Sequence, residues 1–226
     1  MQKTIVFILS ICFSATLMAQ VGIRSYYQNI NAPNWERLDR EGAVLGDTVM
    51  YQPLSIGIGL DYWFRLGDYR VEFFPEVGYM QMSSFQVDDN RLQWDQWFAR
   101  VNTHFYVFDF EEDCDCPTFS KQSPWLKKGF FFSLSAGAAY AQYDRIVTPD
   151  LRHSNVNFTA SIGLGLDIGI NDFITLTPNI QWAHWFTPEW QGLAAGEVMD
   201  LERSHATAVQ FGLRLGLRFD QLFYYY

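Results

Sequence analysis

Residues 156–170 read VNFTASIGLGLDIGI, and apolar side chains recur there at every second position. Valine, phenylalanine, alanine, isoleucine and leucine occupy the even-numbered positions. Asparagine, threonine, serine, glycine and a single aspartate occupy the odd-numbered ones. Because successive side chains of a β-strand point to opposite faces, this stretch predicts a strand with one apolar and one polar face.

The same alternation divides the rest of the chain into strand-sized segments. It is clear in residues 54–64 and 207–219. Weaker versions of it occupy residues 21–28, 70–82, 93–110, 130–143 and 173–186. Together with 156–170 these make eight segments. Their lengths meet or approach the roughly 9–11 residues with which a tilted strand crosses a bilayer.

The polar face of these segments separates a membrane barrel from a soluble barrel that holds a ligand. A soluble barrel would present Lys, Glu and Thr to water, whereas this face carries Gly, Ser, Asn and few charges. After residue 19 the chain has three lysines, and all of them lie in one connector, at 121, 127 and 128. Small polar residues suit the crowded inside of a narrow barrel, so we expect the apolar face to contact lipid.

Composition and the N-terminal segment exclude further classes of protein. The 226 residues carry a formal net charge of −9, which argues against the basic face that a nucleic-acid-binding protein needs. A hydrophobic fraction of 49% is too high for an intrinsically disordered chain. Residues 1–19 combine Lys3, an apolar run and a final Ala19, the features of a secretory signal peptide. We therefore expect export, cleavage near Ala19 and a single barrel domain over residues 20–226.

Aromatic residues gather near both ends of the predicted strands, where the two interfaces of a membrane would lie. The aromatic residues expected at the outer interface are Trp94, Trp97, Tyr140, Tyr143, Trp182, Trp185 and Phe186. Those expected at the periplasmic interface are Tyr62, Trp63, Phe64, Phe73, Phe105, Phe108, Phe110, Phe130, Phe132, Phe173 and Phe219.

With these features the chain resembles the small eight-stranded outer-membrane β-barrels of the OmpA/OmpX porin-like type. Its last segment, QFGLRLGLRF over residues 210–219, is similar to the terminal strand that such proteins use as an assembly signal. The resemblance implies an all-β, eight-stranded antiparallel up-and-down transmembrane barrel in a Gram-negative outer membrane. It also implies membrane lipid and the barrel-assembly machinery as partners. The chain continues past this strand, so the role of Tyr224–Tyr226 stays open.

Charged residues on the polar faces are expected to meet inside the barrel. Alternation points these side chains inward: Arg24, Arg100, Arg214, Arg218, Asp61, Glu72, Glu76, Asp167 and His104. The interior of eight strands is only just wide enough for side chains, and an unpaired charge there is costly. We therefore predict a paired network that plugs the lumen. A gated proton or ion path is the alternative interpretation.

The connector 111–129, EEDCDCPTFSKQSPWLKKG, is long for a periplasmic turn. Its Cys114 and Cys116 lie in an exported chain, so a disulfide between them is expected. Bridging to a partner protein and metal binding are alternatives, although two thiolates alone do not complete a tetrahedral metal site. The acidic first half and lysine-rich second half suggest a docking element for a periplasmic partner.

Catalysis has little support in the sequence. Histidines occur near serines at His153–Ser154 and Ser204–His205, and His184 lies near the outer end of a strand. No spacing defines the orienting acid and oxyanion site that a hydrolase needs. We expect a non-enzymatic protein without cofactor or metal, with a structural or interaction role exerted through loops 29–52 and 187–205 and the connector. A narrow channel or small-solute transporter is the alternative, followed by a lipid-modifying enzyme at the rim.

Overall fold

The structure is a computed structural model. It describes residues 20–31, 55–65, 69–87, 90–108, 129–145, 152–171, 173–186, 189–190, 202–203 and 206–218. The predicted signal peptide 1–19, Cys114, Cys116 and the segment Tyr224–Tyr226 lie outside these residues, as do most of the predicted loops. The backbone of Arg218 is described, but its side chain is not.

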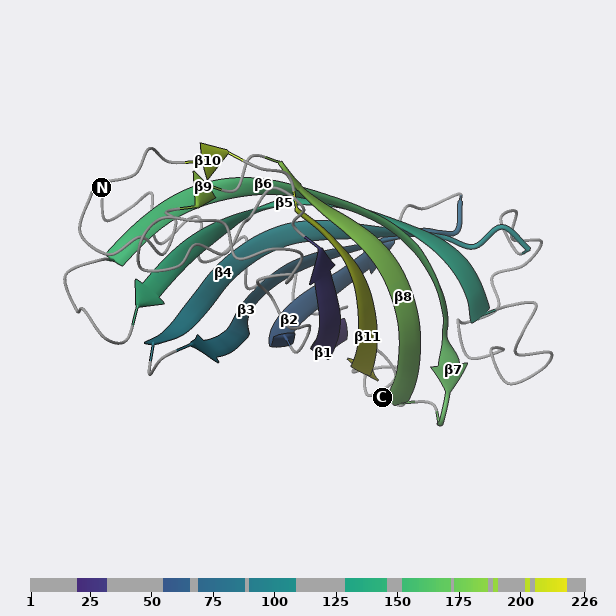
Figure 1. The fold of residues 1–226 in the computed structure, drawn as a ribbon. Helices are drawn as coiled ribbons and strands as arrows, with labels where there is room; N and C mark the ends of the chain where they lie inside the picture. The colour runs from purple at the N-terminus through teal and green to yellow at the C-terminus, as the bar shows by residue number, and fades with distance from the viewer. Residues whose placement is uncertain are drawn as a thin grey trace, which may run out of the picture.

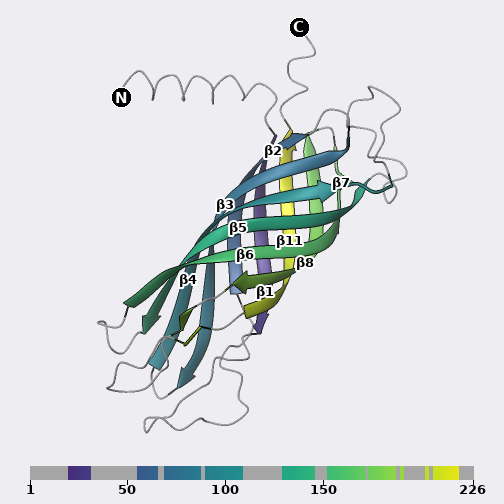
Figure 2. The same cartoon turned by 90° about the horizontal axis from the view of Figure 1, so that it is seen from above.

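Eight long strands form a closed antiparallel barrel (Figure 1). They are β1 Gln20–Asn31, β2 Ser55–Arg65, β3 Val71–Val87, β4 Asn90–Phe105, β5 Phe130–Arg145, β6 Arg152–Leu166, β8 Ile174–Phe186 and β11 Ala206–Arg218. Each strand pairs with its neighbour in the chain, and β11 pairs with both β8 and β1. Figure 2 shows β1 and β11 side by side, where they close the sheet in an unbroken register from Gln20↔Arg218 to Asn31↔Thr207. The predicted eight-stranded up-and-down barrel is confirmed.

The ladder between β6 and β8 is interrupted once, opposite Pro178. Pairing stops at Gly165↔Asn179 and resumes through the short strand β7, Ile168–Gly169. Proline has no backbone N–H to donate, which explains a break at this point of the ladder. The backbone N–H of Asp167 donates instead to the carbonyl oxygen of Gly129, at 2.9 Å. Two further short strands, β9 Glu189–Trp190 and β10 Glu202–Arg203, pair with each other apart from the barrel.

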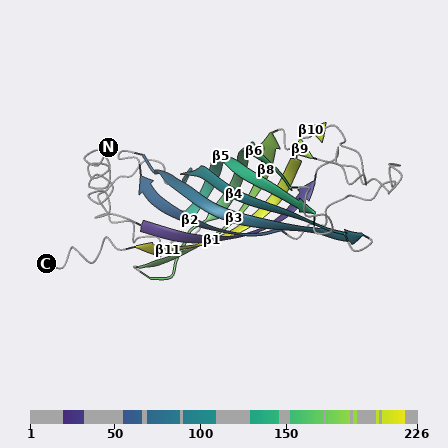
Figure 3. The same cartoon turned by 90° about the vertical axis from the view of Figure 1, so that its left-hand side faces the viewer.

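The hairpin of β3 and β4 extends beyond its neighbours, at the end of the barrel opposite Gln20 and Arg218 (Figure 3). Residues of β3 after Met82 have no partner in the described part of β2, which begins at Ser55, whereas pairing with β4 continues to Val87↔Asn90. A β-bulge lies between Ser83 and Gln86. The expected strand segments 70–82 and 93–110 leave residues 83–91 as a loop between them, and this expectation was wrong, because β3 continues to Val87 and β4 begins at Asn90. This mostly polar stretch forms a two-stranded β-ribbon, in which Gln86 pairs with Arg91 and Val87 pairs with Asn90. We call this end the hairpin end, and the end with Gln20 and Arg218 the terminal end.

The burial pattern is the reverse of that in a water-soluble protein. On β2, the outward Ile56, Ile58 and Leu60 are 60%, 56% and 55% exposed, whereas the inward Ser55 and Asp61 are each 3% exposed. Water-soluble proteins instead bury their aliphatic side chains and expose their charges. The described residues include no helix of sufficient length and apolarity to cross a membrane.

Two of the predicted interfacial tryptophans point into the barrel. Trp94 is fully buried and Trp185 is 4% exposed, and both pack in an apolar cluster that fills the hairpin half of the lumen. The other members of this cluster are Tyr26, Ile30, Met80, Ala141, Ala183, Ala206 and Ala208. The outward positions on the same strands belong to Trp97 and Trp182, which are 59% and 51% exposed. Residues three apart in a strand occupy opposite faces, so assigning both tryptophans of each pair to one interface was wrong.

Candidate functional site in the barrel lumen

Asp61 on β2 joins two arginines from neighbouring strands. The Arg24 Nε atom donates to Asp61 Oδ2 at 2.6 Å. Arg214 approaches with both Nε, 2.8 Å from Oδ2, and Nη2, 2.7 Å from Oδ1. Arg24 and Arg214 face each other directly across the β1–β11 ladder, an arrangement that is destabilising for like charges. The shared carboxylate offsets this repulsion, and the absence of a side chain at Gly22 leaves room for the Arg214 guanidinium.

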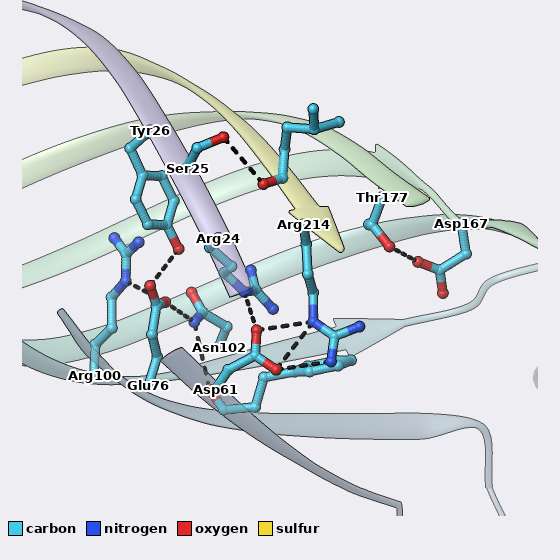
Figure 4. Close-up of polar contacts among 12 residues, drawn as sticks. Arg24, Ser25, Tyr26, Asp61, Glu76, Arg100, Asn102, Asp167, Thr177 and Arg214 are labelled. Carbon is cyan, nitrogen blue, oxygen red and sulfur yellow. Dashed lines mark hydrogen bonds and ion pairs between the residues drawn. The ribbon is translucent and has the colours of Figure 1, made fainter. Parts of the chain in front are cut away.

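Glu76 on β3, the cross-strand partner of Asp61, is the centre of a second cluster beside the first (Figure 4). Its Oε2 atom accepts hydrogen bonds from Arg100 Nε at 2.9 Å and Asn102 Nδ2 at 2.7 Å. Its Oε1 atom accepts one from the Tyr26 hydroxyl at 2.5 Å. Glu76 and Arg100 are direct cross-strand partners, so the β3–β4 register alone brings their charges together. The Arg100 guanidinium also lies over the Tyr26 ring, 4.5 Å from its centroid.

A third cluster lies toward the terminal end and includes three residues that the sequence analysis missed, Tyr106, Arg70 and Thr177. The Tyr106 hydroxyl contacts Glu72 Oε2 at 2.9 Å and also contacts Asp167, whose other oxygen accepts from Thr177. The Arg70 guanidinium lies 4.3 Å from the centroid of the Tyr106 ring. Arg70 precedes Glu72 by two positions, and Tyr106 follows His104 by two positions. Each therefore shares a strand face with a residue that the sequence analysis had directed inward. This two-residue spacing could have identified both residues as inward-facing.

Trp63 also belongs to this third cluster. Its indole Nε1 atom donates to Glu72 Oε2 at 2.8 Å. The sequence analysis placed Trp63 among interfacial aromatic residues, although it shares the inward parity of Asp61. Its hydrogen bond to a carboxylate of the interior corrects that interpretation.

His104 is buried in the lumen, but none of the described residues forms an ion pair or hydrogen bond with its ring nitrogens. Its ring stacks on Phe131 at a centroid distance of 3.8 Å and lies 4.3 Å from Phe74. Neither ring nitrogen has a hydrogen-bond partner among the described residues. The same Phe74 ring lies 4.7 Å from the Arg214 guanidinium, so it separates His104 from the arginines. Among the described side chains, no three His, Cys, Asp or Glu residues are grouped to hold a metal ion.

Amides form the layer between the Glu76 cluster and the apolar cluster. Gln210 accepts from Arg100 Nη1 at 3.2 Å and donates to Gln28 at 3.2 Å. Gln181, the cross-strand partner of Gln210 on β8, accepts from the Ser161 hydroxyl at 3.0 Å. The lumen here encloses a cavity of about 20 Å³ beside Arg100, which is room for a single water molecule.

The predicted rim histidines and serines are not brought together in the described part of the chain. His184 stands on the outer surface of β8, between Trp182 at 6.0 Å and Phe186 at 4.6 Å. Its cross-strand partner in β6 is Ala160, and Ser154 lies six residues further along, roughly 20 Å at the rise of a strand. The side chains of His153, Ser204 and His205 lie outside the described residues.

A closed sheet with charges inside and aliphatic side chains outside decides the class of protein. Such a barrel is stable only when lipid surrounds it, because each exposed apolar row would otherwise face water. The chain is a small transmembrane β-barrel of the outer-membrane type.

Solved structures of small outer-membrane barrels are similar in fold to this chain. Neisserial surface protein A (NspA) is 12% identical, with a TM-score of 0.46, over 89% of this chain and 97% of that chain. Ail, the attachment invasion locus protein of Yersinia pestis solved with the heparin analogue sucrose octasulfate, is 10% identical, with a TM-score of 0.46, over 89% and 97%. OprG from Pseudomonas aeruginosa is 10% identical, with a TM-score of 0.42, over 89% and 96%. No protein-family model and no curated protein matches the sequence.

Proposed function

We propose that this protein is a closed outer-membrane barrel with a structural and interaction role. It supports the envelope as a rigid wall, displays its hairpin end outside the cell and offers the connector with Cys114 and Cys116 to a periplasmic partner. The chain reaches the membrane after cleavage near Ala19. Its partners are outer-membrane lipid and the barrel-assembly machinery, and it works without a cofactor and without catalysis.

The filling of the lumen carries this proposal. The terminal half is crossed by the three clusters around Asp61, Glu76 and Tyr106, and the hairpin half by the apolar cluster around Trp94 and Trp185. The cavity beside Arg100 is too small for a hydrated ion, at about 20 Å³. In two of these clusters a buried carboxylate accepts hydrogen bonds from arginines of other strands, so the charged side chains are held across the lumen.

The orientation follows from the strand count. Bacterial barrels with an even number of strands keep both chain ends in the periplasm and place their longer connections outside. The hairpin end then faces the cell exterior, with the β3–β4 ribbon extending furthest from the wall. Segments held by a rigid scaffold are the usual place for binding, which favours this end as the interaction surface.

Single-channel recording tests the proposal. Residues 20–226 are refolded into a planar bilayer, and heat-modifiable gel mobility verifies that the barrel has formed. A silent membrane is the expected result. Reproducible conductance steps that shift in the Glu76→Gln or Arg100→Ala variant would overturn a closed lumen and make transport the leading function.

A narrow water-filled path is the second candidate function, and one observation favours it. Several buried donors of the lumen have no hydrogen-bond partner among the described residues: Arg24 Nη1 and Nη2, Arg100 Nη2, Gln28 Nε2 and Gln96 Nε2. Buried polar groups of this kind are usually satisfied by ordered water, and a chain of waters can conduct protons. Proton flux into vesicles under a pH gradient, measured with and without the protein, distinguishes this candidate from the closed barrel.

A further inference from the structure

The outer wall of the barrel carries an apolar groove across strands β2 to β6. It has a volume of about 950 Å³, and its lining is formed by outward side chains and by the backbone of small residues. A barrel wall is convex around its axis, so a hollow of this size needs a local cause. The groove lies on the surface that faces the bilayer and is separate from the lumen clusters.

Two neighbouring rows of the sheet explain the hollow. One row is aromatic, because Tyr79, Trp97 and Tyr140 are successive cross-strand partners on β3, β4 and β5. The next row has Ala99 and Ala138 directly opposite each other. Two adjacent alanines beside three large rings leave a recess whose floor is the sheet itself. Trp97 is 59% exposed, so its ring stands out from the wall and forms one side of this recess.

A polar row borders the aromatic row on the side of the hairpin end. Its successive cross-strand members are Gln81, Asp95, Gln142 and Ser154. The Tyr79 hydroxyl donates to Asp95 at 2.8 Å. The outward wall therefore changes from apolar to polar within one row, as the bilayer does between its acyl chains and its head groups.

We propose that this groove binds one glycolipid molecule of the outer leaflet. An acyl chain lies in the recess over Ala99 and Ala138, and the sugar head group contacts the polar row. The occupant comes from the bilayer because the groove opens only toward it. The head group is assigned as a sugar because the four residues of the row include no arginine or lysine that would bind a phosphate. Its carboxylate and the neighbouring amides accept and donate hydrogen bonds as sugar hydroxyls require.

The test uses native mass spectrometry on the refolded mature chain in detergent micelles. The probes are a synthetic glycolipid with a disaccharide head group and a phosphatidylglycerol with acyl chains of the same length. The wild-type protein is expected to retain one glycolipid. The Ala138→Leu variant fills the recess and is expected to bind it roughly tenfold more weakly. The Ala136→Leu variant is the matched control, because Ala136 is exposed on the same strand outside the groove lining and should bind as the wild type does.

The head-group assignment has its own variant. Asp95→Ala is expected to weaken retention of the glycolipid and to leave retention of phosphatidylglycerol unchanged. Equal retention of both lipids by the wild type would overturn the sugar assignment. Equal loss in the Ala136→Leu and Ala138→Leu variants would overturn the site itself, because the bound lipid would then belong to the general lipid annulus. Heat-modifiable mobility confirms folding in every case, and no outcome depends on whether the lumen conducts.

Discussion

At the scale of single residues, the balance of charge in the lumen depends most on Asp61, which accepts from both Arg24 and Arg214. Replacing it with alanine leaves two buried guanidinium groups opposite each other without a counter-charge. We expect the Asp61→Ala variant to lose about 3–5 kcal/mol of unfolding free energy, the range for a buried ion pair deprived of one partner. Urea titration in phospholipid vesicles, followed by tryptophan fluorescence, measures the difference.

A double variant shows whether this loss comes from the unpaired charges. Removing Arg214 together with Asp61 takes away one of the two uncompensated guanidinium groups. The double variant should therefore be more stable than the sum of the two single losses implies. Strict additivity would mean that Asp61 and Arg214 contribute independently, contrary to their contact.

Glycines on the inward face of β2 also differ in what surrounds them. A Cβ atom at Gly59 would collide with the carboxylate of Glu76, which Arg100 holds in place. At Gly57 the nearest atom is Met80 Cε at 3.0 Å, the end of a flexible side chain. We expect Gly59→Ala to cost about 1–3 kcal/mol, as overpacking does, and Gly57→Ala to cost less. The same urea titration compares the two, and equal costs would argue that Glu76 is free to move.

At the scale of strands, alternation in the sequence was sufficient to predict the eight strands of the barrel. Among the charged residues it assigned to the lumen, the side chain of Arg218 lies outside the described residues, and Arg70 was missed. It could not predict the break of β6 at Asp167, because that depends on Pro178 of another strand. It also missed the paired extension of β3 and β4, because Phe85 and Val87 are the only apolar residues in 83–91 and two positions are too few to establish an alternating pattern. The ion pairs and hydrogen bonds among the lumen residues depend on the register between strands. The alternating pattern within one strand carries no information about that register.

The outward row of β11 allows the bilayer depth of a strand to be measured. Leu213 is 45% exposed near the middle of β11, whereas Thr207 pairs with Asn31 at the hairpin end of the same strand. An arginine on the lipid face costs about 2–4 kcal/mol at the bilayer midplane and about 0–1 kcal/mol near an interface. We expect Leu213→Arg to fall in the first range and Thr207→Arg in the second. Refolding yield and urea stability in vesicles provide the measurement, and similar costs at both positions would contradict the transmembrane placement of β11.

At the scale of the whole molecule, the lumen contains two kinds of barrier in series. In the proposed closed barrel, the charged clusters of the terminal half and the apolar cluster of the hairpin half would each obstruct the passage of ions. The outer surface of the barrel is apolar along the middle of the strands and becomes polar toward the hairpin end. The two-residue period of the sequence therefore specifies both the side chains that fill the lumen and the apolar surface that contacts lipid.

Two barriers in series predict that removing the outer one leaves the barrel closed. Trp94→Ala empties the centre of the apolar cluster, but the Glu76 and Asp61 clusters beneath it remain paired. We expect the folded variant to stay silent in a planar bilayer, as should the control Trp97→Ala, whose side chain faces lipid. Conductance in Trp94→Ala and not in Trp97→Ala would mean that the apolar cluster is the sole barrier. The charged half would then be an open path, and the water-filled lumen would replace the closed one as the better account of this protein.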